Sequence, residues 1–395
     1  MTQKVSTLNR ENNGSKKWNR NYIEKRFNIQ EKQKIYPLFI ADMDFRHSDK
    51  IIKQLEKVVL DDDFGYFDVC ESYYHSICRW QKKVHHIELK EEWIIPANGT
   101  IAALHMAASA LAVNDNFLIM TPVYGVFKTI GLSFGKLYDY ALKEVKGRYS
   151  FDLKEIEQAI ITQNINTLIF CNPHNPSGRM WTKDELKSLV GVCKKHKVKI
   201  FSDEIHGDLI LTDEKFVSLI EFNDIYSDIL VSTSPNKSFN LSGLTTSYLL
   251  TNNSTWKNLI EQEMLKYHIS MNRMGIEASR IVYDYGQEWF SDVLVVIKEN
   301  ILIVEEMCRD TDLGFMAPDA GYLLWIKLDK VKDIDRYIQD LSFKTGVLLE
   351  TGSRFIGNYN QYIRINVATD RNLLIEAMTL FKNHYENYEG DSNEN

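Results

Sequence analysis

The chain has 395 residues, of which 44% are hydrophobic, 12% aromatic and 26% charged, and its formal net charge is −7. This composition is typical of a soluble protein with one large domain and a smaller one, and the negative charge argues against nucleic acid as an obligate partner. The polar amino terminus predicts no signal peptide, and no apolar run is long enough to predict a membrane span.

Short apolar runs alternate with helical patterns from about residue 93 to 250. The runs are continuous rather than alternating, which is typical of strands that helices cover on both faces. Strand–helix–strand units of this kind predict an α/β fold with a largely parallel sheet. The five predicted strands are Phe117–Met120, Asn166–Cys171, Val198–Ser202, Asp228–Thr233 and Ser247–Thr251.

Two of the intervening helices carry start signals. Thr182 and Glu185 have the spacing of a capping box, and Asp152 with Glu155 opens another helix in the same way. Both signals precede helical patterns that separate predicted strands, so they support the alternating order.

The pattern changes after about residue 285. A long amphipathic stretch, Ser291–Met307, precedes two strand-like runs, Gly321–Leu328 and Tyr362–Ala368. We expect a smaller α+β carboxy-terminal domain from 286 to 395, with a frayed tail from residue 385. Residues 46–285 are then the large domain, and residues 1–45 a segment that packs with the small domain and the active site.

Polar residues follow the predicted strands. Lys237 and Ser234 come directly after one strand, and Asp203 ends another. Asn175 lies in a proline-bracketed turn, and Tyr124 follows the first strand. Because the carboxyl ends of parallel strands meet at one edge of a sheet, we expect these side chains to lie close together.

Two further features point to anions. Gly99 and Thr100 begin an Ala-rich helix, whose free N–H groups suit a phosphate. Arg364 lies on an apolar strand, where a buried guanidinium is costly without an anion. Taken singly, Asp203 could cap a helix, Asn175 could close a turn, and Tyr124 could belong to the core. His85 and His86 are interpreted as surface residues.

Together these groups describe a pocket for pyridoxal 5′-phosphate (PLP). The lysine amine can form a Schiff base with the aldehyde, and the acid can keep the pyridine nitrogen protonated so that the ring accepts electrons. The helix start offers a phosphate site, the tyrosine an aromatic face and the asparagine a hydrogen-bond donor.

The order of these motifs resembles the fold-type I (aspartate aminotransferase-like) PLP enzymes, and within them the MalY/PatB-type cystathionine β-lyases. The resemblance implies a large domain with a mostly parallel sheet and a smaller α+β domain. The motif ADMDF favours the lyase branch over ordinary aminotransferases. The motifs that carry the resemblance are GSKKW (14–18), ADMDF (41–45), FGY (64–66), TPVYGVF (121–127), NPHNPSGR (172–179), SDEIH (202–206), NKSFNLSGL (236–244) and YIRIN (362–366).

The resemblance also implies a role for each matching residue. Lys237, Tyr124 and Asp203 form the catalytic group: the Schiff-base lysine, the tyrosine stacked on the ring and the partner of the ring nitrogen. Asn175 donates to the 3′-oxygen of the ring, and His206 lies near that oxygen or is a structural histidine.

The remaining implied contacts concern the phosphate and the substrate. Gly99, Thr100 and Ser234 hold the phosphate, and Tyr66 reaches the phosphate of the neighbouring subunit, so a homodimer with its active site at the interface is expected. The substrate-binding residues are Arg364, which clamps the α-carboxylate, and Ala41 and Asp42 of ADMDF; Asp42 and Asp44 are expected to be loop or capping residues rather than acid–base groups.

The sequence departs from the family pattern at a few positions. Thr100 stands where relatives have valine, and Ser242 stands where alanine is common. Position 245 is Thr, where aminotransferases often carry an arginine for the phosphate, and residues 352–361 are a looser version of the glycine-rich approach to the arginine strand. These departures bear on substrate preference more than on the use of the cofactor.

The expected activity is α,β-elimination from L-cystathionine or a related sulfur amino acid, giving a thiol, pyruvate and ammonia. Transamination of an amino acid is the alternative, since it shares the early steps, and a regulatory protein that keeps the PLP pocket is a second alternative. The five cysteines form no Cys-x-x-Cys pair, which argues against a zinc site or a disulfide framework and favours a reducing cytoplasm. No metal is expected in the site.

Overall fold

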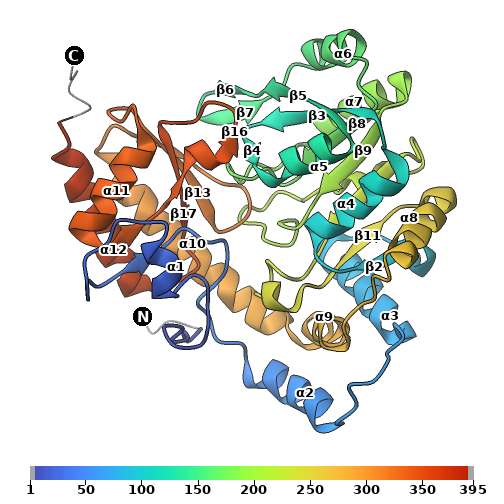
Figure 1. Cartoon of the computed structure of the whole chain (residues 1–395), viewed down its shortest axis with the longest axis horizontal. Coiled ribbons are helices and arrows are strands. Elements are labelled where there is room, and N and C mark those ends of the chain that lie inside the picture. Colours follow the sequence, from blue (N-terminus) through green and yellow to red (C-terminus); the bar gives the residue numbers. More distant parts are fainter. Residues whose placement is uncertain (1–4, 390–395) are drawn as a thin grey trace.

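The computed structural model describes residues 5–389 and contains a large and a small β-sheet (Figure 1). The large sheet has seven strands in the order β2-β11-β10-β9-β8-β3-β5. Its neighbours are parallel except for β11, which runs antiparallel to β10 and β2, so the prediction of a largely parallel sheet is confirmed. The strands are β2 (Ile94–Ala97), β3 (Asp115–Thr121), β5 (Gly135–Ala141), β8 (Thr167–Cys171), β9 (Lys199–Asp203), β10 (Ile229–Thr233) and β11 (Ser247–Leu250).

Two strands of this sheet were not predicted. β5 forms one edge and buries only Tyr140 fully, so its sequence contains no apolar run. β2 forms the other edge and has only four residues. The prediction depended on continuous apolar runs, and β5 has none, whereas β2 is apolar and buried but short.

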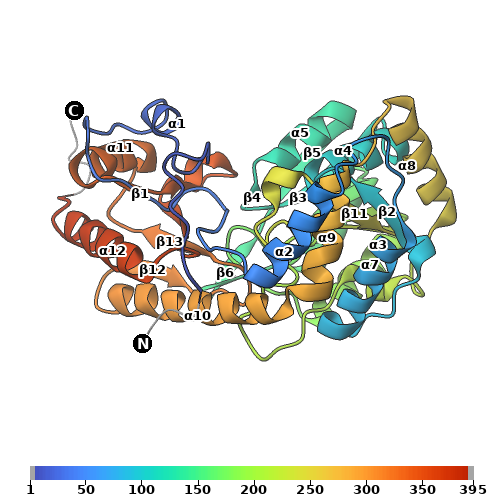
Figure 2. The same ribbon diagram turned by 90° about the horizontal axis from the view of Figure 1, so that it is seen from below.

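Helices cover both faces of the large sheet (Figure 2). Successive side chains of a strand point to opposite faces, and in β3 Phe117 belongs to one core and Leu118 to the other. The helices beside the Phe117 core are α4 (Thr100–Leu111), α5 (Val126–Phe134) and α8 (Ser254–Lys266); those beside the Leu118 core include α3 (Glu71–Trp80), α6 (Leu153–Thr162), α7 (Lys183–His196) and α9 (Arg273–Tyr285).

The predicted helix starts are confirmed. The Thr182 side chain accepts a hydrogen bond from the Glu185 N–H, and the Glu185 carboxylate accepts one from the Thr182 N–H, which completes the capping box of α7. Asp152 accepts hydrogen bonds from the first turn of α6. The predicted Ala-rich helix is α4, and it begins directly after Gly99.

The carboxy-terminal part has the predicted long helix, α10 (Gln287–Arg309), and both predicted strands. Its antiparallel sheet has the order β12-β13-β17-β15. Two helices, α11 (Ile334–Thr345) and α12 (Arg371–Glu386), complete it, and Tyr385 is buried in α12, so the polar tail begins later than expected. Residues 390–395 of that tail lie outside the described residues. The strands are β12 (Leu313–Met316), β13 (Leu323–Leu328), β15 (Glu350–Thr351) and β17 (Tyr362–Asn366).

The amino-terminal segment lies against this carboxy-terminal part (Figure 1, blue). Its strand β1 (Tyr36–Pro37) pairs in parallel with β14 (Val347–Leu348). The predicted domain boundaries at residues 45 and 285 stay predictions.

The remaining elements are α1 (Arg20–Glu24), α2 (Asp49–Leu60), β4 (Val123–Tyr124), β6 (Lys143–Val145), β7 (Arg148–Ser150), β16 (Phe355–Ile356), a π-helical turn η1 (Gln81–His85), and the 3-10 turns η2 (Glu91–Trp93), η3 (Leu219–Phe222), η4 (Ser242–Leu244) and η5 (Gly352–Arg354).

The surface interpretation of His85 is wrong. The π-helical turn at the end of α3 places His85 in the interior, where its Nε2 lies 2.7 Å from Asp208 Oδ1. The same carboxylate accepts hydrogen bonds from Trp80 Nε1 and from the hydroxyl of Ser238, the residue after Lys237. His86, the next residue, is exposed as expected.

Between residues 5 and 389, no helix is both long and apolar enough to cross a membrane. The same residues contain no cluster of three or more His, Cys, Asp or Glu side chains that could hold a metal ion. All five cysteines are free thiols.

Candidate active site

Lys237 is held by a main-chain carbonyl. It lies in the turn after β10, is partly buried, and donates a hydrogen bond from Nζ to the Ala41 carbonyl oxygen at 2.6 Å. Burial and, to a smaller extent, the charge of Arg364 lower the pKa of Lys237 to about 8, against the opposing effects of Asp42 and Asp203. Near neutral pH, part of the Lys237 population is therefore an unprotonated amine, the form that can act as a nucleophile or a base.

Asp203 is the last residue of β9, and its side chain is buried. Burial raises the pKa of Asp203 to about 6, although a hydrogen bond from the Ile205 N–H at 3.2 Å and the charge of Lys237 oppose this shift. The carboxylate is therefore ionised above pH 6 and is suited to hold a proton on a partner atom.

Arg364 is buried on β17, and no carboxylate of the described residues pairs with it. Its Nη1 donates to Asn175 Oδ1 at 3.2 Å and its Nη2 to the Phe39 carbonyl at 3.4 Å, while its Nε has no partner. The guanidinium also lies over the Phe355 ring, 5.2 Å from its centroid. Burial lowers the pKa of Arg364. Since Asn175 Oδ1 is engaged, the NH2 of Asn175 is the part that can donate elsewhere.

His206 follows Asp203 by three residues and is buried. Its ring lies edge-on to Tyr322, with 6.3 Å between ring centroids, and its Nδ1 has no hydrogen-bond partner in the part of the chain that the structure describes. Burial lowers the pKa of His206 to about 3, and the charges of Lys237 and Arg364 act in the same direction. The imidazole is therefore neutral, with a free nitrogen for a ligand.

The predicted phosphate site combines a helix start with the turn before Lys237. Gly99 caps α4 with φ +83°, a conformation that favours glycine, and Thr100 is the first residue of the helix. The Ser234 hydroxyl donates to the Thr246 carbonyl at 2.6 Å and accepts from the Asn236 N–H at 3.0 Å. To donate to a phosphate, Ser234 would have to give up the Thr246 carbonyl.

The two predicted tyrosines lie apart from each other. Tyr124 is on β4, directly opposite Phe355 of β16, and so belongs to the side of the site that contains Arg364. Tyr66 is fully exposed. The structure therefore brings together Lys237, Asp203 and the surroundings of Arg364 within one chain, but it leaves Tyr66 on the surface.

Two groups at the site were missed. Tyr322 donates its hydroxyl to the Ala41 carbonyl at 3.1 Å, and Phe39 supplies a carbonyl to Arg364. Tyr322 lies within a predicted strand-like run. The sequence therefore predicts the strand, but it does not predict the contact with Ala41, which is 281 positions away. Every residue has a main-chain carbonyl, so the residue types do not show that the carbonyls of Phe39 and Ala41 have a special role.

The predicted residue Asp42 is engaged within the chain. Its carboxylate is bound by Arg10, with contacts of 3.0 and 2.8 Å.

The residues fit an anionic ligand. Among residues 5–389, neither Lys237 nor Arg364 forms an ion pair, which leaves two basic side chains in one region without a contacting carboxylate. His206 Nδ1 and Arg364 Nε are buried and have no hydrogen-bond partner among these residues. Buried charges and polar groups are costly unless a ligand satisfies them, so the site is built to be completed by an anion such as a phosphate or a carboxylate.

This fold and this site define the class of fold-type I PLP-dependent enzymes. The chain belongs to the family Aminotransferase class I and II, whose profile matches residues 49–379. It is 28% identical over 354 residues to cystathionine beta-lyase PatB of Bacillus subtilis (strain 168), covering 88% of this chain and 91% of that protein.

Solved structures agree with this assignment. A PLP-bound protein from Clostridium difficile 630 superposes with a TM-score of 0.91 at 31% identity, covering 96% of this chain and 99% of the other. Cystalysin from Treponema denticola, which contains PLP, gives a TM-score of 0.90 at 25% identity over 97% and 98% of the two chains. The expected family and fold are confirmed.

Proposed function

We propose that this protein is a PLP-dependent carbon–sulfur lyase that cleaves L-cystathionine or a related sulfur amino acid by α,β-elimination. The observation that carries the proposal is that one site contains two basic groups. Lys237 is an amine of lowered pKa, and Arg364 is a buried guanidinium with no ion-pair partner among the described residues. The similarity to cystathionine beta-lyase PatB supports elimination as the reaction.

Different residues of the site would bind different parts of PLP. Lys237 would form the covalent link, and Asp203 would keep a proton on the pyridine nitrogen. The NH2 of Asn175 and the free nitrogen of His206 would face the ring oxygen, and Tyr124 would lie against the ring. The N–H groups that begin α4 at Gly99 and Thr100, together with Ser234, would bind the phosphate.

When bound, PLP supplies an electron sink for the negative charge that develops at the substrate Cα. Arg364 would bind the α-carboxylate with its guanidinium fork, which fixes the orientation of the Cα–H bond. Lys237, once released from its covalent link, would take the Cα proton onto Nζ. The Cβ–S bond would then break, the sulfur would leave as a thiol with the proton that Lys237 holds, and water would hydrolyse the released aminoacrylate to pyruvate and ammonia.

Product analysis tests the reaction. Purified protein with added PLP is incubated with L-cystathionine, and pyruvate and homocysteine are measured beside amino transfer to a 2-oxo acid. We expect pyruvate and homocysteine in equal amounts without any added 2-oxo acid. Transamination is the competing activity because the matching family is named for it. Amino transfer without pyruvate would replace the lyase by an aminotransferase.

We also propose that the enzyme is a homodimer whose active sites lie at the subunit interface. The support is the fully exposed Tyr66, which stands in an exposed segment together with Phe64 and follows the exposed apolar residues Val59 and Leu60 of α2. A large apolar surface of this kind needs a covering partner. The five free cysteines support a reducing compartment such as the cytoplasm.

Subunit mixing tests the shared site. We expect Tyr66→Ala to weaken PLP binding by roughly 10-fold, the effect of losing one hydrogen bond to a charged group. When this variant is unfolded and refolded with an equal amount of inactive Lys237→Ala, each mixed dimer regains one intact site, and activity should rise to about a quarter of wild type at limiting PLP. No gain on mixing, or a monomer by ultracentrifugation, would contradict the proposal.

A further inference from the structure

The carbonyl that holds the Lys237 amine lies in a loop that is fixed from the active-site side. Asn366, two residues after Arg364 on β17, donates from Nδ2 to the carbonyls of Ile40 and Asp42, both at 2.6 Å. These two carbonyls flank Ala41, so the Asn366 side chain sets the position of the carbonyl between them.

A second asparagine connects the loop with the turn that contains Lys237. Asn240 Oδ1 accepts from the Met43 N–H at 3.0 Å, and Asn240 Nδ2 donates to the Met43 carbonyl at 2.9 Å. Asn240 adopts a left-handed conformation with φ +52°. The loop is thus tied to the elements that supply both functional cations.

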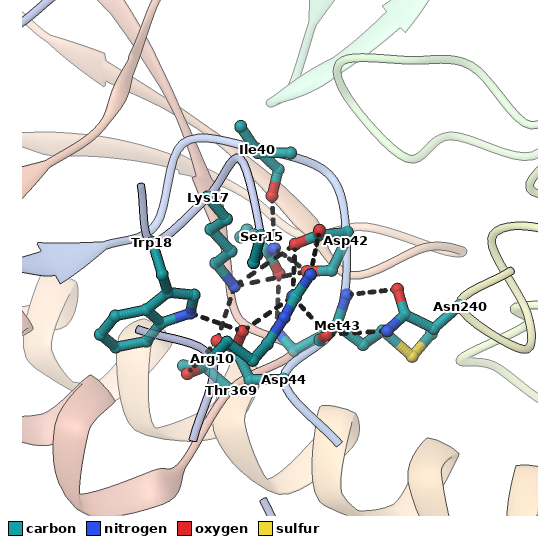
Figure 3. A network of polar contacts seen from close by, with 12 residues as sticks. Arg10, Ser15, Lys17, Trp18, Ile40, Asp42, Met43, Asp44, Asn240 and Thr369 are labelled. Atoms are coloured by element: carbon teal, nitrogen blue, oxygen red, sulfur yellow. Dashed lines mark hydrogen bonds and ion pairs between the residues drawn. The ribbon is translucent and has the colours of Figure 1, made fainter. Parts of the chain in front are cut away.

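On its other side the loop is held by a charge cluster, which we define as Arg10, Lys17, Asp42 and Asp44 (Figure 3). Lys17 and Asp44 are buried, and Arg10 and Asp42 are partly buried. Lys17 is fully buried, and its Nζ lies 2.7 Å from Asp44 Oδ2. Asp44 also accepts hydrogen bonds from Arg10 at 3.1 Å, Trp18 Nε1 at 3.0 Å and Thr369 Oγ1 at 2.8 Å. Although burial raises it, the charge and hydrogen bond of Lys17 hold the pKa of Asp44 below its ordinary value.

Arg10 is the member that contacts the loop most widely. It binds the Asp42 carboxylate with both terminal nitrogens and donates to the Met43 carbonyl at 2.8 Å. Figure 3 shows Arg10 and Lys17 converging on this short stretch of main chain from the amino-terminal segment. The contacts of Arg10 therefore fix Asp42 and Met43, the two residues that follow Ala41.

A cluster of this kind is an expensive way to stabilise a fold. Removing charges from water costs several kcal/mol per ion, and well-packed apolar residues often stabilise as much or more. Buried ionic groups are best explained where they select one geometry of the chain around them. Here the geometry that they select is that of residues 40–44, whose Ala41 carbonyl contacts the amine of Lys237.

We propose that Arg10 and Asp44 are positioning residues for Lys237: through the main chain of residues 40–44 they hold the Ala41 carbonyl against the Lys237 amine and so fix the amine for its reaction with the cofactor aldehyde. This inference rests on the proposed function, because it takes Lys237 as the point of cofactor attachment. Arg10 and Asp44 thereby contribute to catalysis through the main chain that they hold.

The test separates attachment of PLP from occupancy of its pocket. Cofactor-free wild type and Arg10→Met are mixed with PLP, and the rate of covalent attachment is followed by visible absorbance. Binding of pyridoxine 5′-phosphate, which lacks the aldehyde and cannot bond to Lys237, is measured by calorimetry. Rates are taken at about pH 10, where an amine with the pKa of Lys237, about 8, is largely unprotonated.

Arg10→Met should slow attachment about 10-fold, since a misplaced reacting group loses rate steeply with small displacements. The affinity for pyridoxine 5′-phosphate should stay within about 2-fold of wild type, because the pocket itself is unchanged. Arg280→Met is the matched control: Arg280 pairs with Glu277 and Asp284 of its own helix α9, and its loss should leave both measurements unchanged.

Two outcomes would overturn the inference: an unchanged attachment rate, or an equal loss of attachment and of pyridoxine 5′-phosphate binding. If Arg10→Met does not fold, Arg10→Lys, which keeps the charge but loses the fork, should show a smaller slowing with the same selectivity. If wild type forms no covalent link, or Lys237→Ala forms one equally well, the proposed function itself fails, and the two failures remain distinct.

Discussion

Lys237→Ala is expected to lower kcat/KM for cystathionine cleavage by about 100,000-fold, in the range seen when a covalent nucleophile or its base is removed. The amine of Lys237 is the group that we assign both to the covalent link and to the Cα proton. Its lowered pKa and its contact with a neutral carbonyl make it the reactive amine of the site. Steady-state kinetics, with pyruvate as the measured product, give the size of the loss.

A matched control shows whether the loss of activity is specific to Lys237 or follows from removing any lysine. Lys344 is exposed and pairs with Asp340 one turn earlier in α11. Lys344→Ala should keep full activity and the visible absorbance of the bound cofactor, whereas Lys237→Ala should lose that absorbance band. Turnover by Lys237→Ala within 100-fold of wild type, roughly 3 kcal/mol of barrier, would show that another group performs these steps.

Arg364→Met should have two opposite effects. Activity falls, because the guanidinium is the proposed partner of the substrate carboxylate, and removing a buried, hydrogen-bonded charge pair costs roughly 1,000-fold in kcat/KM. The cofactor-free protein becomes more stable by about 1–3 kcal/mol, because a buried cation without a carboxylate partner is replaced by an apolar side chain of similar length. Kinetics and thermal unfolding measure the two effects on the same protein.

The matched variant for this prediction is Arg364→Lys, which keeps the positive charge but loses the planar fork. It should fall between wild type and Arg364→Met in activity and give no gain in thermal stability. A less stable Arg364→Met would mean that the contacts with Asn175, Phe39 and Phe355 stabilise the fold by more than burial of the charge costs.

Much of this fold was predictable because its signals are local. The central strands are continuous apolar runs; Asp203 ends one of them, and Lys237 lies in the turn after another. The start of α7 at Thr182 is a signal contained within four residues. In a parallel sheet, strand ends gather at one edge, so local patterns were enough to place these side chains in one region.

The rest depends on contacts between distant segments. The Ala41 carbonyl meets Lys237 across 196 positions of sequence, and carbonyls are present at every residue. The sequence around His85 does not predict the π-helical turn that buries this residue beside Asp208, so its interpretation as a surface residue was wrong. Lys17 lies in a polar segment of the sequence, and only the fold shows that it is fully buried against Asp44.

Borohydride reduction followed by peptide mapping tests the central claim most directly. Reduction makes a lysine–PLP link permanent, and mass spectrometry of the digested protein then identifies the modified residue. The account predicts one modification per chain, on the peptide that contains Lys237. A modification on another lysine, or none in protein saturated with PLP, would contradict it.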